Sequence, residues 1–510
     1  MRRNMHKSIF IHMVGVTVLA ALVGCGGRQA VRHDELLPPA CGIVSPPAER
    51  VDTVRVAMFD APRPEHAPAA TNDAERLLFR QLYETLITVD CLGVVRPALA
   101  ESWERGDGGR RWMFELRDDA RFWDGTPVTA RDVVESWRYT ALDQMTRGSG
   151  AGIGSMAPSA GIDSAVAADQ RVLRVYFARP HREVPRALAA PAFAVAKSTW
   201  DSRWPHGSGP YRIVSSERDA PWKPWRTIAA HPAFGGGGPI IRFVTTSAAD
   251  ARDLLEGGID LLVTADQAVI EYAAGQPQFD AVPLPYDRAY ILCAPSRVSG
   301  RASGGAPATI PPALSNELAR DAVRGDARGC EPPYWWNDLG DCGEVSPAVP
   351  WRPRVLNDAY PPDAERRILF DLTDTVARGL AERIVALAAA RTDASADAAA
   401  LFSALPGLHG GESGLRAEGV SERALGESLL DGGDFAYVVS VPRRPPNPCD
   451  AARSLMKRAR WVPASGSDLS DAFIPLVETR PHVIVRKGTI GLLVDWSGDV
   501  LVINGTAGGR

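Results

Sequence analysis

FWDGTPVTARDV, the sequence of residues 122–133, predicts a turn followed at once by a helix. Before it, RWMFELR at residues 111–117 alternates apolar and polar side chains, which predicts a strand with one face in water. Residues 124–127 (DGTP) have the composition of a turn. Thr129 is placed to cap the helix, and the carboxylate of Asp132 in the first turn favours the helix dipole. The stretch therefore predicts a strand–turn–helix unit.

Outward from this unit, strands and helices are mixed without a strict period, and no internal repeat is evident. Strands are predicted at residues 51–59, 172–177, 211–214, 240–244, 259–262, 367–372, 434–439 and within 483–504, and a hairpin at 88–95. Helices are predicted at residues 73–86, 99–103, from 129 onward, 249–256 and 375–389. This pattern predicts an α/β chain with mixed sheets, and 510 residues predict two or three domains.

The composition is that of a globular protein, with 45% hydrophobic and 23% charged residues. The formal net charge is −4. Nucleic-acid binding requires a clustered positive surface, and the sequence has no basic tail or basic amphipathic helix. The composition therefore argues against a nucleic-acid partner.

The N-terminus has the features of a secretory signal. Arg2, Arg3 and Lys7 precede an apolar run over residues 9–23, which is short for a membrane-spanning helix. Cys25 follows LVG, and LVGC resembles the bacterial lipobox, which implies cleavage before Cys25 and lipidation of its thiol. Cleavage would change the net charge from −4 to −7, because three positive charges are lost. A plain signal peptide and an N-terminal anchor helix are the alternatives.

Six cysteines remain after the lipid site, and an even number in an exported chain predicts disulfides. They are Cys41, Cys91, Cys293, Cys330, Cys342 and Cys449. Cys330 with Cys342 is the first choice of pairing, followed by Cys293 with Cys449 and Cys41 with Cys91. Free buried thiols are the alternative. Zinc is not expected, because no two of these cysteines lie two to four residues apart.

Several blocks resemble, in sequence and spacing, the family 5 bacterial extracellular solute-binding proteins, the peptide- and nickel-binding group. They are residues 82–86 (LYETL), 97–103 (PALAESW), 112–133, 207–211 (GSGPY) and 254–260 (LLEGGID), with looser matches at 430–435 and 474–476. The similarity runs from about residue 50 to the end of the chain and is closest up to about residue 290.

The resemblance implies an α/β fold of the periplasmic binding protein type II, with two hinged lobes of mixed sheets plus an extra small domain. The implied division is a signal peptide (1–24), a tether (25–50), lobe I (51–75, 166–288 and 472–510), an additional domain (76–165) and lobe II (289–471).

The function implied is that of a substrate-binding component of an ABC importer, which captures peptides or similar small solutes between its lobes and docks on permease subunits. With lipid on Cys25, the exported protein is expected at the cell membrane or outer membrane, facing the periplasm or the cell exterior. We expect a monomer without cofactor or metal. No catalytic residue is expected, because Gly-x-Ser-x-Gly, His-Glu-x-x-His and phosphate-loop motifs are absent from the sequence.

By position, the resemblance points to six cleft residues: Phe59, Asp60, Tyr290, Tyr437, Arg443 and Arg444. Phe59 and Tyr437 are expected to form apolar walls, and the two arginines to bind a carboxylate. The alternatives are core packing for the aromatic residues and a solvated loop for the arginines.

Two departures from the family pattern bear on the ligand. The stretch between Pro448 and Ile474 is short. Arg444 stands where peptide-binding members carry an acidic residue that pairs with the ligand amine. A cation there repels an amine and attracts a carboxylate. Two alternatives to peptide import therefore stay open: an anionic ligand, or a lipoprotein that keeps the binding fold and acts as an envelope sensor or scaffold.

Overall fold

The computed structural model describes most of the chain after the N-terminal segment. The described residues are 39–146, 161–199, 202–217, 227–235, 238–246, 251–293, 312–337, 367–389, 415–421, 435–445 and 473–503, with residues 424, 448, 451 and 452. The predicted signal peptide and Cys25 lie outside them. Among the described helices, none combines the length and the apolar content needed to cross a membrane.

The first sheet has seven strands in the order β13-β20-β12-β2-β11-β10-β9. Their bounds are β2 (Thr53–Met58), β9 (Tyr211–Glu217), β10 (Thr227–Pro232), β11 (Ile240–Thr245), β12 (Leu261–Thr264), β13 (Phe279–Pro283) and β20 (His482–Arg486). The central strand β2 runs parallel to β11 and β12, and the other pairs are antiparallel.

Side-chain alternation along β2 gives this sheet two apolar faces. Val54, Val56 and Met58 pack in a core with the helix α1 (Asp73–Leu82). Ala57 points to the other face, where it packs in a core with the helices α3 (Ala251–Glu256) and α4 (Gln267–Ala274). The first sheet is therefore covered by helices on both faces.

The second sheet has six strands in the order β15-β19-β14-β18-β16-β17. Their bounds are β14 (Arg288–Cys293), β15 (Ala327–Gly329), β16 (Arg367–Asp371), β17 (Arg416–Val420), β18 (Phe435–Pro442) and β19 (Phe473–Thr479). One face packs on the helices α5 (Pro312–Ala322) and α6 (Thr375–Ala389). The opposite face packs on the short 3-10 helix η7 (Trp335–Asn337), where the Trp336 side chain is fully buried.

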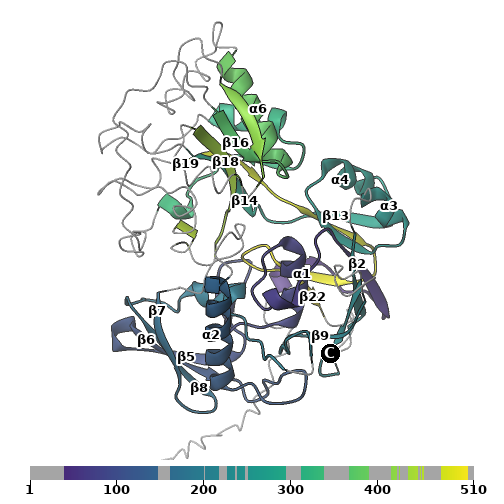
Figure 1. The fold of residues 1–510 in the computed structure, drawn as a ribbon. Helices are drawn as coiled ribbons and strands as arrows, with labels where there is room; N and C mark the ends of the chain where they lie inside the picture. The colour runs from purple at the N-terminus through teal and green to yellow at the C-terminus, as the bar shows by residue number, and fades with distance from the viewer. Residues whose placement is uncertain are drawn as a thin grey trace, which may run out of the picture.

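A third, four-stranded antiparallel sheet has the order β5-β6-β8-β7. Its strands are β5 (Ala100–Gly106), β6 (Arg111–Leu116), β7 (Ile162–Ala167) and β8 (Val172–Phe177), and the helix α2 (Ala130–Thr146) packs on it. Two small sheets complete the described fold: β3 (Ile87–Val89) with β4 (Val95–Pro97), and β1 (Gly42–Val44) with β21 (Gly491–Val494) and β22 (Val500–Ile503). Figure 1 shows the second sheet with α6 at the top, the four-stranded sheet with α2 below it, and β2 with α1 between them.

The chain runs between the first and second sheets twice in the described residues, through residues 284–287 after β13 and through residues 480–481 before β20. The predicted α/β fold with mixed sheets in two lobes and an additional domain is thereby confirmed. Within that fold, we propose to assign β14 to β19 to lobe II and the first sheet to lobe I.

The expected boundaries at residues 76, 166 and 472 differ from the strand pairing. Residues 473–479 form β19, which pairs with β14 in the second sheet, whereas they were expected in lobe I. β8 pairs with β6 and β7 of the four-stranded sheet, and α1 packs on the first sheet. The sequence pattern indicates strands and helices, but sheet membership depends on pairing between residues far apart in sequence.

Near the 122–133 motif, the predicted strand β6 and helix α2 are confirmed, and one predicted helix is wrong. Thr129 and Asp132 cap α2 reciprocally: Thr129 N donates to Asp132 Oδ2 at 2.8 Å, and Asp132 N donates to Thr129 Oγ1 at 3.3 Å. The helix predicted at residues 99–103 is instead the start of β5, which pairs with β6 from Ala100 to Gly106. Leu99 and Trp103 have helical spacing, but tertiary pairing overrides this local preference.

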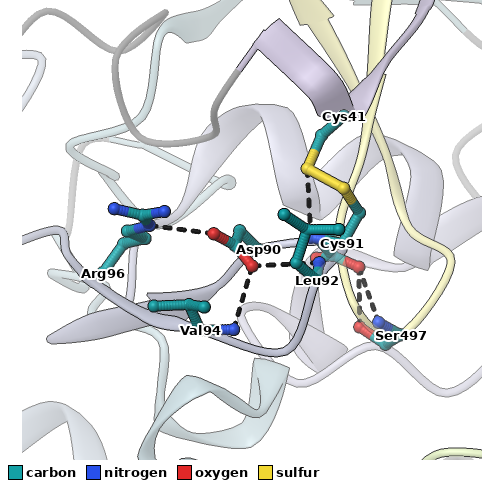
Figure 2. The surroundings of a disulfide bond; sticks show 8 residues. Cys41, Asp90, Cys91, Leu92, Val94, Arg96 and Ser497 are labelled. Carbon is teal, nitrogen blue, oxygen red and sulfur yellow. Dashed lines mark hydrogen bonds and ion pairs between the residues drawn. A yellow bond between two sulfur atoms is a disulfide. The ribbon is translucent and has the colours of Figure 1, made fainter.

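The disulfide Cys41–Cys91, one of the three expected pairs, is confirmed. It joins residues with Cα atoms 5.6 Å apart and ties the segment before β1 to the β3–β4 turn (Figure 2). The other two pairs are wrong for this structure, because Cys293 and Cys330 are free thiols. Cys293 is on β14 in the core of the second sheet, and burial raises the pKa of its thiol to about 12. Cys342 and Cys449 lie outside the described residues.

The turn at residues 207–211 docks against the C-terminal end of α1 and against the 122–133 motif. Gly209 N donates to Leu82 O at 3.0 Å, and Trp123 N donates to Gly207 O at 3.1 Å. A Cβ atom on Gly207 would lie 1.9 Å from Leu82 O, so no side chain fits there. The glycine is required by this close approach of two backbones.

We therefore expect Gly207→Ala to lower the free energy of unfolding by about 1–3 kcal/mol, the usual cost of overpacking. Chemical denaturation followed by circular dichroism measures it. Ser208→Ala is the matched control, because the buried Ser208 hydroxyl has no hydrogen-bond partner in the described structure and its loss should cost little. Equal stabilities of the two variants would show that the contact at Gly207 is not tight.

Candidate functional site

A cavity of about 240 Å³ lies between the first and second sheets, beside both crossovers. From the first-sheet side it is lined by residues 57–60 at the end of β2, by one face of α1, and by residues 263–265 at the end of β12. From the second-sheet side it is lined by residues 323–326, Val376 and the start of β14. Residues 284–288, 479–481 and 498–500 close its remaining wall. A space between two lobes beside their connections is a common location for a ligand site.

An ion pair spans this cavity between the two sheets. Asp73 is the first residue of α1 and Arg288 the first residue of β14, and Arg288 Nη2 lies 2.5 Å from Asp73 Oδ2. Burial opposes ionisation of Asp73, but Arg288 and Arg76 hold the pKa of its carboxyl below its usual value. Asp73 raises the pKa of Arg288, so both partners carry full charge at neutral pH.

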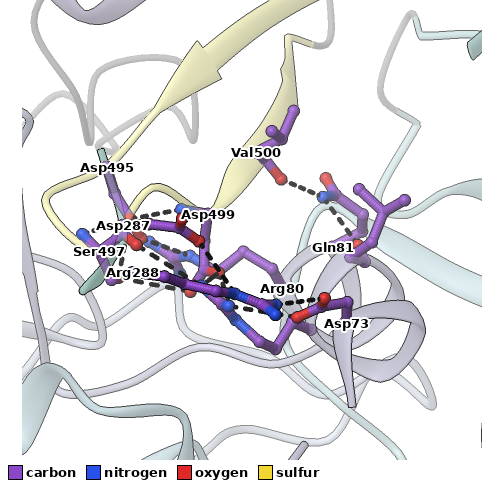
Figure 3. Close-up of polar contacts among 11 residues, drawn as sticks. Asp73, Arg80, Gln81, Asp287, Arg288, Asp495, Ser497, Asp499 and Val500 are labelled. Atoms are coloured by element: carbon purple, nitrogen blue, oxygen red, sulfur yellow. Dashed lines mark hydrogen bonds and ion pairs between the residues drawn. The ribbon is translucent and has the colours of Figure 1, made fainter. Parts of the chain in front are cut away.

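A second set of ion pairs joins α1 to the hairpin between β21 and β22. Arg76 Nη2 lies 2.6 Å from Asp499 Oδ1, and Arg80 Nε lies 3.2 Å from Asp495 Oδ2. Burial, together with Asp499, raises the pKa of Asp495 to about 6. Figure 3 shows Asp495 and Asp499 of the hairpin in the same view as Arg80 of α1 and the Asp73–Arg288 pair. The cluster fixes the helix that supplies one wall of the cavity.

The crossover residues are held by stacked arginines. Tyr286 lies between Arg328 and Arg480, whose guanidinium carbons are 4.1 Å and 4.7 Å from its ring centroid. Asp326 accepts from Arg480 Nε at 2.6 Å and from the Tyr286 hydroxyl at 3.3 Å. Both crossovers are therefore tied to residue 326 of lobe II, on the cavity wall.

Two carboxylates at the cavity, those of Asp287 and Asp60, lack a close ion pair with an arginine. Asp287 Oδ1 is buried and has no hydrogen-bond partner in the described structure, and Asp287 Oδ2 is 3.9 Å from Arg288 Nε. Burial is the main cause that raises the pKa of Asp287. Asp60 at the end of β2 is exposed, and desolvation and the charges of Asp73 and Glu75 raise its pKa. The site thus carries carboxylates that are not fully compensated.

Three of the six sequence-predicted cleft residues line this cavity: Phe59, Asp60 and Tyr290. Phe59 is 46% exposed, which is unusual for a large apolar side chain and fits a wall that faces an open space. The Tyr290 hydroxyl donates to Asp374 Oδ1 at 3.1 Å, which fixes the ring at the lobe II side.

The other three predicted residues lie elsewhere. Tyr437 is buried on β18 in the core around Trp336. Arg443 forms an ion pair with Glu478 at 2.9 Å, donates to Pro333 O at 2.8 Å and stacks over Tyr334. Its donors are therefore used within lobe II.

Arg444 stacks over Trp496, with its guanidinium carbon 4.4 Å from the ring centroid. Desolvation, and then the like charges of Arg443 and Arg328, lower the pKa of Arg444. This arginine contacts a residue of the β21–β22 hairpin and does not line the cavity. From its place in the sequence we expected Arg444 to bind a carboxylate, but its guanidinium stacks on the β21–β22 hairpin instead.

Sequence reasoning missed the charged residues that dominate the cavity, among them Asp73, Arg76, Asp287 and Arg288. The available signal was the PYDR sequence at residues 285–288, where charges follow a proline directly before a strand. That pattern is also common in solvated loops, so the sequence alone does not mark Asp287 and Arg288 as site residues. Only the folded structure shows that they lie next to α1.

Comparison with known proteins finds similarity to bacterial binding proteins. Residues 94–323 match the model for bacterial extracellular solute-binding proteins, family 5 Middle. The chain is similar to the periplasmic oligopeptide-binding protein OppA of Escherichia coli, with 42% identity over 131 residues, which is 25% of this chain and 21% of that protein. It is 36% identical over 127 residues to the periplasmic murein peptide-binding protein MppA of Escherichia coli, with 25% of this chain and 22% of that protein covered. These alignments span only about a fifth of the length of the curated relatives.

Solved structures show the same fold over most of the chain. NikA from Brucella suis, in complex with Fe(III)-EDTA, has a TM-score of 0.55 at 14% identity, with 86% of this chain and 95% of that chain covered. The binding protein AgaA from A. tumefacien R10, in complex with agropinic acid, has a TM-score of 0.53 at 14% identity, with 89% of this chain and 99% of that chain covered. At this level of identity the likeness concerns the fold alone.

Proposed function

Because the chain belongs to the family 5 bacterial extracellular solute-binding proteins, we propose that it captures a small solute between its two lobes and delivers it to the permease of an ABC importer. The observation that carries this proposal is the cavity between two sheets that are joined, in the described chain, by two short crossovers. Two bodies joined in this way can close by rotation about the crossovers. A ligand that contacts both walls then favours the closed arrangement.

The size of the cavity favours a small ligand. At about 240 Å³ it is smaller than the roughly 300–1,000 Å³ of pockets that take drug-sized molecules. An extended oligopeptide exceeds that space, whereas a single amino acid, a very short peptide or another compact solute fits it. Peptides are the ligands named for the relatives OppA and MppA, so a short peptide is the first candidate.

The N-terminal sequence supports export and anchoring. We propose that the signal over residues 1–24 directs export, that Cys25 receives the lipid, and that the tether over residues 25–50 holds the lobes near a membrane. The Cys41–Cys91 disulfide supports an oxidising compartment. Binding without catalysis is the activity that this proposal assigns to the protein.

Native mass spectrometry of the protein, purified without denaturation and incubated with an extract of periplasmic solutes, tests the proposal. We expect a bound molecule of low mass at one copy per chain. Val376→Trp should abolish binding, because Val376 lies on the cavity wall and a large ring would fill the space. Arg378→Trp on the same helix is the control, because Arg378 is exposed and does not line the cavity. Absence of any bound solute, or equal binding by the Val376→Trp variant, would contradict the proposal.

A further inference from the structure

The charged side chains around the cavity do not balance. Its lining contains the carboxylates of residues 60, 73, 287, 326 and 499 and the guanidiniums of residues 76, 288, 324 and 480. Three carboxylates are taken up by the ion pairs described above: 73 with 288, 499 with 76, and 326 with 480. Asp60 and Arg324 remain, together with Asp287, whose one ion pair is the long contact of 3.9 Å with Arg288, a residue that already pairs closely with Asp73. The lining therefore has one carboxylate more than it has guanidiniums.

Asp287 is the most exceptional of the three. Its side chain is only 12% exposed, and its Oδ1 atom has no hydrogen-bond donor in the described structure. The nearest guanidinium groups belong to Arg288 and Arg76, and both donate to other carboxylates, at 2.5–2.9 Å. The backbone of Asp287 is fixed, because its carbonyl oxygen accepts from Arg443 N at 2.6 Å. Asp287 is therefore held in place at the cavity with an acceptor left free.

A buried carboxylate oxygen without a donor is costly, because desolvation penalises the charge and no hydrogen bond at that oxygen offsets the penalty. Desolvation accordingly raises the pKa of Asp287 in the unliganded protein. Arginine neighbours that are already paired do not remove this cost. A cationic donor supplied from the cavity would remove it.

We propose that Asp287, assisted by Asp60 after the end of β2, binds an ammonium group of the transported solute. This inference rests on the proposed function and specifies its ligand class: a compact solute that carries a free amino group. An ammonium group offers three donors on one atom, which suits a site whose free acceptors come from separate elements, the end of β2 and the crossover before β14. A purely anionic solute is disfavoured, because the lining already carries one carboxylate in excess of its guanidiniums.

The position of Arg324 is consistent with a ligand that also carries a carboxylate. Arg324 is exposed, lines the cavity and has no ion pair with a described residue. A zwitterion would therefore find complementary charge on both sides. The amino group is the essential feature, because among the described carboxylates of the cavity only Asp287 has a buried oxygen without a donor.

The test uses the solute released by unfolding from the protein of the mass-spectrometry experiment. The solute is added back to refolded protein either untreated or after its amino groups have been acetylated with acetic anhydride, and affinities are measured by isothermal titration calorimetry. We expect the acetylated solute to bind at least ten times more weakly. We expect Asp287→Asn to weaken binding of the untreated solute roughly 10- to 100-fold, the range for losing a hydrogen bond between charged groups.

Two controls separate a ligand contact from a structural role. Asp52→Asn makes the same charge change at an exposed residue outside the cavity and should leave affinity unchanged. Asp287→Asn should raise the melting temperature of the unliganded protein, because it removes an uncompensated buried charge. If Asp287→Asn raises the melting temperature and also weakens solute binding, the Asp287 carboxylate contributes to binding at the cost of stability.

The outcomes are distinct. A released solute without an amino group, equal binding after acetylation, or unchanged affinity of the Asp287→Asn variant would overturn the assignment of Asp287 and leave solute capture intact. If no solute binds to the unaltered protein, the proposed function fails, and this inference fails with it.

Discussion

Glu478→Ala is expected to lower the free energy of unfolding by about 3–5 kcal/mol, the cost of breaking a buried ion pair from one side. Glu478 lies on β19 and is 0% exposed. Its carboxylate accepts from Arg328 at 2.8 Å, from the Tyr334 hydroxyl at 2.9 Å and from Glu331 N at 3.1 Å, and it pairs with Arg443 at 2.9 Å. Removing it leaves the donors of four residues without their acceptor.

Glu478→Gln should fall between the parent and the alanine variant, because an amide keeps the shape and one acceptor but loses the charge. Glu135→Ala is the control. Glu135 forms an exposed ion pair with Arg131 on α2, and such pairs contribute less than about 1 kcal/mol. The measurement is guanidinium denaturation followed by circular dichroism. A loss of less than 1 kcal/mol in Glu478→Ala would mean that Arg328 and Arg443 find water or other acceptors without the carboxylate.

Replacing both Cys41 and Cys91 by serine is expected to lower the free energy of unfolding by about 2–5 kcal/mol. The disulfide closes a loop of 50 residues, and a chain-entropy calculation for that length gives about 4 kcal/mol. It also secures β1, whose only pairing in the described structure is with β21. Loss of the bond should therefore free the segment before β2 first.

Thermal unfolding with and without a reducing agent measures this effect. The reduced parent protein should match the serine double variant, and the double variant should not respond to the reducing agent. Cys330→Ser is the control for a cysteine substitution, because Cys330 is a free thiol. A double variant as stable as the oxidised parent would show that contacts of β1 with β21 suffice without the cross-link.

Local structure could be predicted from the sequence wherever a motif contained its own partners. Thr129 caps α2 through Asp132, three residues away, so the helix start was predictable from residue types alone. The glycine at 93 allows the turn between β3 and β4 with a φ of 82°. Residues 99–103 show where local prediction fails. Their apolar spacing predicts a helix, but residues 100–103 pair with β6 as part of a strand.

Long-range features could not be predicted in this way. Phe473–Thr479 has the pattern of a strand in either lobe, and only its pairing with β14 assigns it to the second sheet. Phe59, Asp60 and Tyr290 were expected at the cleft from the family resemblance, and they line the cavity. Their part in ligand binding stays a prediction. Asp73 and Arg288 were missed because they are 215 residues apart, and nothing in either local sequence indicates the other.

The central claim is that two lobes close on a solute held between them. Small-angle X-ray scattering of the solute-bound protein, and of the same protein after the solute has been removed by reversible unfolding, tests this claim most directly. The account predicts a larger radius of gyration after removal and a return to the smaller value when the released solute is added back. Identical scattering curves in the three samples would contradict it.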